Sequence, residues 1–321
     1  MEPELELTSS VISSWVLHAL KIILGDESIR QEILLHYHPR LHYGNITKIK
    51  TAGYKNHVVT FNPFILTTRE DKFEKIRNYL AEIVKLKGTV VFTATNIQRD
   101  SDDMETHFQT FIVDNDDKMV YIIDPANNRT VDKNSPKYKK SKKILVSGQG
   151  IYYAEVAHEV VKPFFETATD YRVEMISLSY PAQIIEDDVF CQSWSLYILN
   201  TLLDNNAYKT QHLFDIPEAQ INKYDMILGF YKKIIKDMPT ISKYLKAEYR
   251  GEINDCEDCP KKELLKINPA KFLSKMTKED MVNEPISNAP ISNAPISNAP
   301  ISNAPISNAP ISNAPISNAP I

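Results

Sequence analysis

The C-terminal end of the sequence repeats a five-residue unit, Pro-Ile-Ser-Asn-Ala, and this repeat limits how much of the chain can fold. Seven copies run from Pro285 to Ala319, and Pro320 and Ile321 close the sequence. A proline at every fifth position removes a backbone donor and pushes the preceding residue towards extended geometry, so neither a helix nor the interior of a sheet can propagate there. The repeat has no charged or aromatic residue. We therefore expect a disordered tail over 285–321.

A second interpretation of the repeat is a docking array, in which each unit binds a partner weakly and the number of copies supplies avidity. A short repeated motif is weak evidence of binding when one sequence is considered alone. We favour the passive tail and keep weak multivalent docking as the alternative.

Charge and cysteine content narrow the class of protein. The 321 residues include 37 Lys and Arg against 41 Asp and Glu, which gives a formal net charge of −4. No excess of cations is present to replace the counterions of a phosphate backbone, so general nucleic-acid binding is not expected. Three cysteines in a long chain are not typical of a disulfide framework, and we expect a reducing compartment, the cytoplasm or the nucleus.

The N-terminal residues do not resemble a membrane segment. Residues 1–6 are acidic, where a secretory leader would be basic, and the stretch 9–24 carries Trp15, His18 and Lys21 in an amphipathic pattern. We expect neither a signal peptide nor a membrane span.

Helical and strand patterns follow one another irregularly along the chain. Apolar residues at helical spacing predict helices, while β-branched runs separated by turns predict strands and one hairpin. Strands gather in the middle of the sequence and helices at both ends, which is typical of an α+β fold with a central mixed or antiparallel sheet, flanking helices and a helical C-terminal part. The expected helices are 9–24, 70–87, 152–167, 192–203 and 217–247, and the expected strands are 89–95, 107–113, 119–123, 144–147 and 171–179, with short strands within 45–66 and an acidic loop over 100–105.

Two residues of the predicted hairpin suit acid–base chemistry. His107 begins the first strand, and Asp124 ends the second. The beginning of one hairpin strand lies beside the end of its partner, so the carboxylate can contact the imidazole and fix its tautomer. His107 and Asp124 are therefore candidate catalytic residues.

A cysteine and a glutamine follow later in the chain. Cys191 lies where an acidic turn passes into an apolar helix, and a cysteine at a helix N-terminus gains thiolate character from the helix dipole and the unpaired amides. Gln183 comes eight residues earlier, after a predicted strand, and its side-chain amide could stand beside the Cys191 backbone N–H. Those two donors would stabilise a tetrahedral oxyanion.

The order of these residues resembles the cysteine proteases that cleave ubiquitin-like modifiers and the adenovirus-type maturation proteases. The resemblance covers about 89–205 and implies a papain-like fold, with His107 as general base, Asp124 as its orienting acid, Gln183 as oxyanion donor and Cys191 as nucleophile. It implies no cofactor and no metal.

Two positions depart from the family pattern. Phe108 follows the histidine where the family usually has Trp, and Gln192 follows the cysteine where the family usually has Gly. A side chain at position 192 could crowd the oxyanion site. The sequence from Cys191 to Trp194 resembles a Cys-x-x-Trp variant in members from large DNA viruses, which implies a viral origin.

Each of these residues also has an ordinary structural interpretation. A lone cysteine ahead of an apolar helix is most often a small buried residue, and a histidine at a strand start is most often a surface residue. Asp124 with Pro125 is a common way to end a strand. A relative that keeps the fold and has lost catalysis therefore remains an alternative.

Four further motifs are weaker candidates. His36, His38 and His42 alternate as metal-binding imidazoles can on an extended segment, but no carboxylate or cysteine lies close in sequence to complete a site. Cys256 and Cys259 have the spacing of a zinc-binding or redox pair, and surface thiols without metal are the simpler interpretation. Two more motifs are the basic stretch 137–143, which could be a nucleic-acid or nuclear-import segment, and His158, a rival general base.

The sequence therefore predicts a cysteine peptidase-like protein that cleaves a peptide or isopeptide bond, in a polyprotein or a ubiquitin-like modifier. The alternative is a catalytically degenerate interaction protein that binds a host or viral protein. In either case the expected partner is a protein, with no role for a membrane. Four regions are expected: an N-terminal extension over 1–88, a protease-like core over 89–205, a helical region over 206–284 and the tail over 285–321.

Overall fold

The computed structural model describes residues 8–43, 57–58, 70–100, 103–125, 161–183, 190–211 and 213–282. All of these lie in a compact unit that spans Met1–Ile286. Within the described part of the chain, no helix is both long enough and apolar enough to cross a membrane. The predictions for the repeat tail, the basic stretch 137–143 and His158 fall outside these residues.

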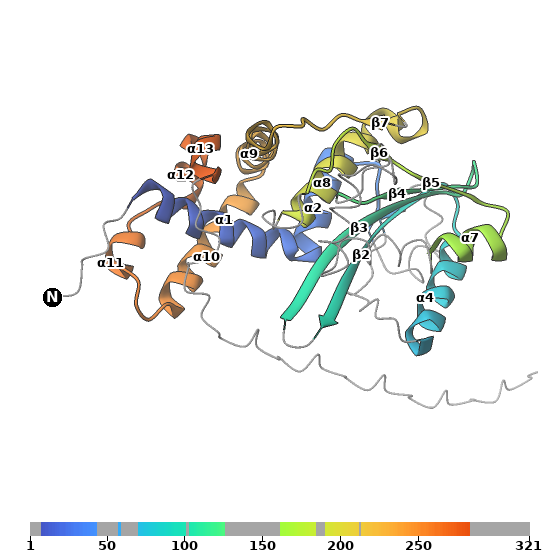
Figure 1. Cartoon of the computed structure of the whole chain (residues 1–321), viewed down its shortest axis with the longest axis horizontal. Helices are drawn as coiled ribbons and strands as arrows, with labels where there is room; N and C mark the ends of the chain where they lie inside the picture. Colours follow the sequence, from blue (N-terminus) through green and yellow to red (C-terminus); the bar gives the residue numbers. More distant parts are fainter. Residues whose placement is uncertain are drawn as a thin grey trace, which may run out of the picture. The chain divides into compact units, whose positions relative to one another are not determined.

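A five-stranded mixed sheet forms the centre of the fold, which confirms the predicted α+β class (Figure 1). The strand order is β1-β2-β3-β4-β5, with β2, β3 and β4 antiparallel and an additional parallel strand at each edge. A separate two-stranded parallel sheet pairs β6 with β7. The strands are β1 (His57–Val58), β2 (Thr89–Asp100), β3 (Asp103–Asp114), β4 (Met119–Ile123), β5 (Arg172–Met175), β6 (Ser177–Leu178) and β7 (Leu213–Phe214).

The β2–β3 hairpin is longer than the sequence indicated. Its register runs from Thr89 opposite Asp114 to Asp100 opposite Asp103, so most of the predicted acidic loop over 100–105 is strand. The pattern misled because a backbone hydrogen-bond ladder continues through polar residues as readily as through apolar ones. The expectation that His107 begins its strand is therefore wrong, since β3 begins at Asp103.

Helices cover the sheet and form most of the C-terminal part, also as expected. The prediction for 217–247 as one stretch misses a break, because Pro239 lacks a backbone donor and begins a new helix. The helices are α1 (Ser9–Gly25), α2 (Glu27–Tyr37), α4 (Glu70–Ile83), α7 (Lys162–Ala168), α8 (Cys191–Leu203), the 3₁₀ helix η2 (Asp204–Lys209), α9 (Gln220–Asp237), α10 (Pro239–Asp255), α11 (Lys261–Leu264), α12 (Pro269–Lys275) and α13 (Lys278–Val282).

Helix ends follow local chemistry. The cap of α1 is Thr8, and its side chain accepts a hydrogen bond from the Val11 amide at 3.4 Å. Asp26 caps α2 by accepting from the amides of Ser28 and Ile29 at 2.8 and 3.3 Å. Gly88 has a φ of 72° just before β2, a left-handed conformation that a residue without Cβ adopts at little cost.

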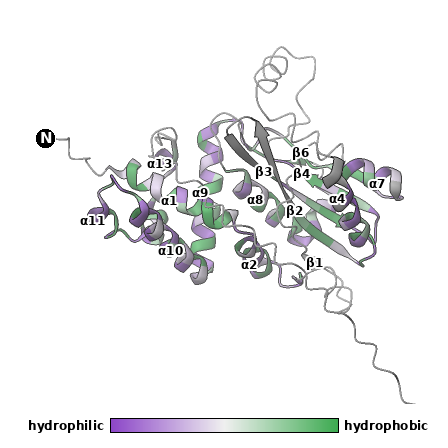
Figure 2. Ribbon diagram, turned by 90° about the horizontal axis from the view of Figure 1, so that it is seen from below, coloured by the Kyte–Doolittle hydropathy of each residue, from purple (hydrophilic) through white to green (hydrophobic). Residues whose placement is uncertain are grey.

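Alternate residues of the central strands face two different cores. Phe111, Val113 and Ile122 pack with α4 and α7, whereas Ile112 and Tyr121 pack with α1, α8 and α9. This alternation follows from the two-residue period of a strand. Figure 2 shows hydrophobic and hydrophilic residues sharing the surfaces of α9 and α10, as amphipathic helices require. The core that contains Ile112 and Tyr121 is the larger of the two, and it includes the helix that begins at Cys191.

Candidate active site

Cys191 is the first residue of α8, as predicted from the acidic turn and the apolar run that follows it. Its side chain is 5% exposed. Two hydrogen bonds fix this end of the helix: Ser195 Oγ donates to the Phe108 carbonyl of β3 at 3.1 Å, and the Tyr231 hydroxyl of α9 donates to Ser193 Oγ at 2.7 Å. The cysteine therefore stands at a helix N-terminus held between the sheet and α9.

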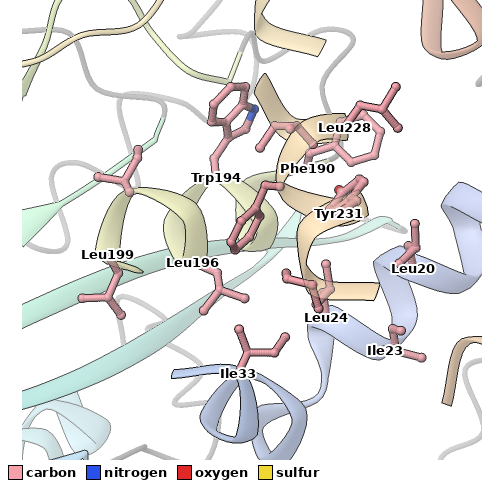
Figure 3. Close-up of a cluster of buried hydrophobic side chains, with 14 of the residues drawn as sticks. Leu20, Ile23, Leu24, Ile33, Phe190, Trp194, Leu196, Leu199, Leu228 and Tyr231 are labelled. Atoms are coloured by element: carbon pink, nitrogen blue, oxygen red, sulfur yellow. The ribbon is translucent and has the colours of Figure 1, made fainter. Parts of the chain in front are cut away.

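Aromatic and aliphatic packing supports the same helix end. Phe190, just before Cys191, contacts the rings of Tyr224 and Tyr231 edge-on, with centroids 6.5 and 6.4 Å apart. Figure 3 shows Phe190 and Tyr231 in one cluster with Leu24 of α1 and Ile33 of α2. Such packing restricts how far the N-terminus of α8 can shift.

Gln192 connects the thiol to α1. The Cys191 thiol donates to Gln192 Oε1 at 3.4 Å, while Gln192 Nε2 donates to the Lys21 carbonyl at 3.2 Å. Lys21 lies four residues before the end of α1. Gln192 is thus 3% exposed and hydrogen-bonded to a neighbouring helix.

Asp124 follows the last residue of β4 and is 2% exposed. Its Oδ2 accepts a hydrogen bond from Gln109 Nε2 at 2.7 Å. Because Thr110 is opposite Ile123 in the β3–β4 ladder, Gln109 stands at the register position that faces Asp124. A neutral amide donor therefore holds this buried carboxylate.

The structure places the backbone of His107 in β3, opposite Asn96 of β2. This position is three residues from Thr110, which lies opposite Ile123, the last residue of β4. The His107 side chain lies outside the described part of the chain, so its role as general base stays a prediction.

Gln183 is held at the end of β4. Its backbone N–H donates to the Pro125 carbonyl at 2.9 Å, which brings the segment after β6 next to Asp124. Residues 184–189, between Gln183 and Cys191, are outside the described residues. The structure thus brings the Gln183 backbone and Asp124 together at the C-terminal end of β4 and docks the Cys191 helix on β3.

Arg30 of α2 is a buried charged residue that no sequence motif identifies. Its guanidinium carbon is 4.7 Å from the centroid of the Phe108 ring, and Nη1 donates to the carbonyls of Leu24 and Gly25 at 3.1 and 2.7 Å. Burial lowers the pKa of Arg30 to about 10. An arginine in an amphipathic helix pattern normally indicates a solvated face, so no sequence signal identifies it.

The histidine cluster does not have the expected extended geometry. His36 lies within α2, and His38 Nε2 is 3.0 Å from Asn200 Oδ1. Burial lowers the pKa of His38. Across the described ranges, no group of three or more His, Cys, Asp or Glu side chains could hold a metal ion.

The two cysteines at the end of α10 lie close together. Cys256 is buried, and the Cys259 thiol donates to the Ile253 carbonyl at 3.7 Å and the Cys256 carbonyl at 3.9 Å. Burial and the adjacent Cys256 thiol raise the pKa of Cys259 to about 12. Cys259 is therefore a poor candidate nucleophile, because the thiolate is the reactive form.

No protein-family model matches the sequence, and no curated protein matches it. Among solved structures, the chain is similar to the Legionella pneumophila effector RavZ in complex with human LC3B, with a TM-score of 0.33, 10% identity, and coverage of 63% of this chain and 56% of that one. It is also similar to ChlaDub1 from Chlamydia trachomatis (TM-score 0.28, 13% identity, 65% and 77% coverage). A second RavZ structure gives a TM-score of 0.25, 10% identity, and 67% and 74% coverage. The chain thus spans little more than half of the first RavZ chain, and these neighbours give no support to a viral origin.

Proposed function

We propose that this protein is a cysteine peptidase that cleaves a peptide or isopeptide bond in a protein substrate. The observation that carries the proposal is the placement of Cys191 at the N-terminus of α8, fixed by hydrogen bonds to β3 and α9. Unpaired amides and the helix dipole favour the thiolate at such a position. All three cysteines are free thiols, which suits the reducing compartment expected from the sequence.

The arrangement at the end of β4 supplies a second support. Asp124 is buried there, and the Gln183 backbone is hydrogen-bonded to Pro125, the next residue. The orienting acid, Asp124, and the oxyanion donor, Gln183, would then lie next to each other at the C-terminal end of β4. Structures that hold reacting groups on rigid elements keep catalytic geometry with little reorganisation.

The proposed reaction follows from these roles. The Cys191 thiolate attacks the substrate carbonyl carbon, and the tetrahedral oxyanion is stabilised by the Gln183 side-chain amide and the Cys191 backbone N–H. His107, oriented by Asp124, gives its proton to the leaving amine. Water then attacks the thioester, with His107 as base, and releases the acid product and the free thiol.

A binding protein without turnover is the second candidate, and a specific observation favours it. The thiol is 5% exposed and donates to Gln192 Oε1, while the Asp124 carboxylate accepts from Gln109. In this arrangement both groups already have protein partners.

Labelling by an electrophilic substrate analogue separates the two candidates. We would incubate the full chain with ubiquitin-like proteins carrying a C-terminal vinyl sulfone and with peptidyl vinyl sulfones, and map the labelled residue by mass spectrometry. A peptidase is expected to be labelled at Cys191, with loss of labelling in Cys191→Ala and at least about a hundredfold slower labelling in His107→Ala.

His36→Ala is the matched control, because it removes an imidazole from α2 and should leave labelling unchanged. Equal labelling of wild type and His107→Ala would show that Cys191 is only an accessible thiol. That result would favour the binding protein.

A further inference from the structure

The buried arginine of α2 and the candidate nucleophile share one support, the C-terminal end of α1. Arg30 donates to the carbonyls of Leu24 and Gly25, and Gln192 donates to the carbonyl of Lys21 on the preceding turn. Arg30 therefore satisfies carbonyl groups that the end of the helix leaves without partners, and Gln192 adds a hydrogen bond to a carbonyl on the turn before them. This common anchor brings the Arg30 guanidinium close to the N-terminus of α8.

A second set of contacts reaches the same place from the sheet. Arg30 covers the ring of Phe108, with its guanidinium carbon 4.7 Å from the ring centroid. The carbonyl of Phe108 accepts from Ser195, one helical turn after Cys191. Arg30 is therefore fixed relative to Cys191 by α1 on one side and by β3 on the other.

The charges that face Arg30 come from two elements. Asp26 and Glu27 from the start of α2 and Cys191 from α8 each favour the protonated guanidinium, and they oppose the effect of burial. Arg30 is 8% exposed, so its field is weakly screened by water and salt. A charged guanidinium near a buried thiol lowers the free energy of the thiolate.

We propose that Arg30, anchored on the end of α1 and on the Phe108 ring, is a positioning residue that stabilises the Cys191 thiolate. The proposal rests on the proposed function for Cys191 as the nucleophile. It gives Arg30 no contact with substrate: its effect on the reaction passes through the charge state of the sulfur. It also gives α1 and α2, which lie outside the region that resembles the proteases, a part in the site.

The pH profile of thiol alkylation tests this effect without any substrate. The full chain would be treated with iodoacetamide between pH 5 and pH 10, and the rate at each cysteine would be read from peptide masses. Replacing Arg30 with Met keeps the bulk and removes the charge. In R30M, we expect the pH at which Cys191 alkylation reaches half of its maximal rate, the midpoint, to rise by about one pH unit or more. Alkylation of Cys191 near pH 7 then becomes about tenfold slower.

Replacing Arg30 with Lys keeps the charge and removes the planar fork. In R30K, the midpoint of the pH profile of Cys191 alkylation is expected within about 0.3 pH units of that of wild type. A purely structural role would give the same Cys191 midpoint in wild type, R30M and R30K, and this outcome overturns the proposal. Cys256, which follows α10, serves as an internal control in every sample, and its rate should not change.

A second variant keeps the proposal testable if R30M does not fold. Glu27 competes with the thiolate for Arg30, and Glu27→Gln removes this competitor while leaving Arg30 in place. The Cys191 midpoint is then expected to fall below that of wild type. An unchanged or raised midpoint in E27Q would overturn the proposal independently of R30M.

The failure of this inference can be distinguished from failure of the peptidase proposal. If vinyl sulfone labelling is absent but R30M shifts the alkylation midpoint, Arg30 tunes the thiol of a binding protein. If labelling depends on His107 but R30M and E27Q leave the midpoint unchanged, the peptidase stands and Arg30 has no role in activating it.

Discussion

Asp124 is a carboxylate that folding removes almost completely from water, and Gln109 is the partner that makes this tolerable. The aspartate is 2% exposed, the glutamine is fully buried, and 2.7 Å separates Gln109 Nε2 from Asp124 Oδ2. A buried carboxylate without donors is costly, whereas a hydrogen bond to a charged group stabilises more than one between neutral groups. The hydrogen bond from Gln109 therefore stabilises the buried Asp124 carboxylate at the end of β4.

Replacing Gln109 with Leu should destabilise the protein by about 2–3 kcal/mol, because the variant keeps the volume but leaves the carboxylate one donor short. Urea unfolding of wild type, Q109L, D124N and the double variant measures the coupling. We expect the double variant to be less destabilised than the sum of the single variants by about 1 kcal/mol or more. Additive effects would contradict a direct Gln109–Asp124 interaction.

Glu27 predicts a pH dependence of stability with a defined sign. Burial raises its pKa to about 6 from an ordinary value of 4.5. The folded state therefore holds this proton more tightly than the unfolded state, and the group makes the protein less stable as the pH rises from about 4.5 to 6. The gain in melting temperature from E27Q should be larger at pH 7 than at pH 4.5. An equal gain at both pH values would contradict this assignment.

At the scale of elements, α8 is tied to α9 through one pair of hydroxyl groups. The Tyr231 hydroxyl donates to Ser193 Oγ at 2.7 Å, and both residues are buried. Tyr231→Phe removes this bond and leaves the ring packing in place, so we expect a loss of about 1 kcal/mol in unfolding free energy. Tyr244→Phe is the matched control, because Tyr244 is 40% exposed on α10. A loss of the same size in both variants would contradict a specific α8–α9 link.

The two thiols after α10, Cys256 and Cys259, allow a prediction about reactivity. Burial is the main cause that raises the pKa of Cys259, and the neighbouring Cys256 thiol adds to it. Cys256→Ala removes the second cause, so the pKa of Cys259 should fall while remaining above its ordinary value. Alkylation of Cys259 at pH 8.5 should then be faster than in wild type, as peptide masses would show. An unchanged rate would indicate that burial alone protects this thiol.

The sequence predicts an element of the fold well when the residues that determine it lie within that element. Apolar periodicity predicts the helix over 9–24, the start of the helix at 70 and the helix after Cys191, because that signal lies within each element. The length of β2 and β3 was missed, since their extent is set by pairing with each other and polar residues conceal it. The order of strands required contacts that no single segment encodes.

The candidate site shows the same limit. The placement of Cys191 at a helix start was predictable from the acidic turn and the apolar run. Arg30 and Gln192 were missed as partners of α1, because their hydrogen bonds join residues 5 to 171 positions apart. The position of His107 was misjudged because β3 continues past the end of β4.

At the scale of the whole molecule, one hydrophobic core joins both ends of the folded chain. It includes Val16 and Leu20 of α1, Ile112 of β3, Leu199 of α8 and Ile241 of α10. His18 of α1 is also 3.2 Å from Glu252 of α10. The N-terminal and C-terminal helices thus contribute to the same core as the helix that begins at Cys191.

Because this core is shared, we expect residues 89–205, the region that resembles the proteases, to be unable to fold alone. A fragment of residues 89–205 lacks α1, α9 and α10, so it would expose the apolar face of α8 to water. This exposure costs a free energy of about 25 cal/mol for each Å² of apolar surface. We expect the fragment to lack a cooperative urea transition, and removal of residues 8–25 from the full chain to have the same effect. A chain ending at Ile286 should unfold in one transition with the midpoint of the full chain, because the compact unit ends there. A cooperative transition in the 89–205 fragment would show that the protease-like region forms its own core and that the terminal helices are additions to it.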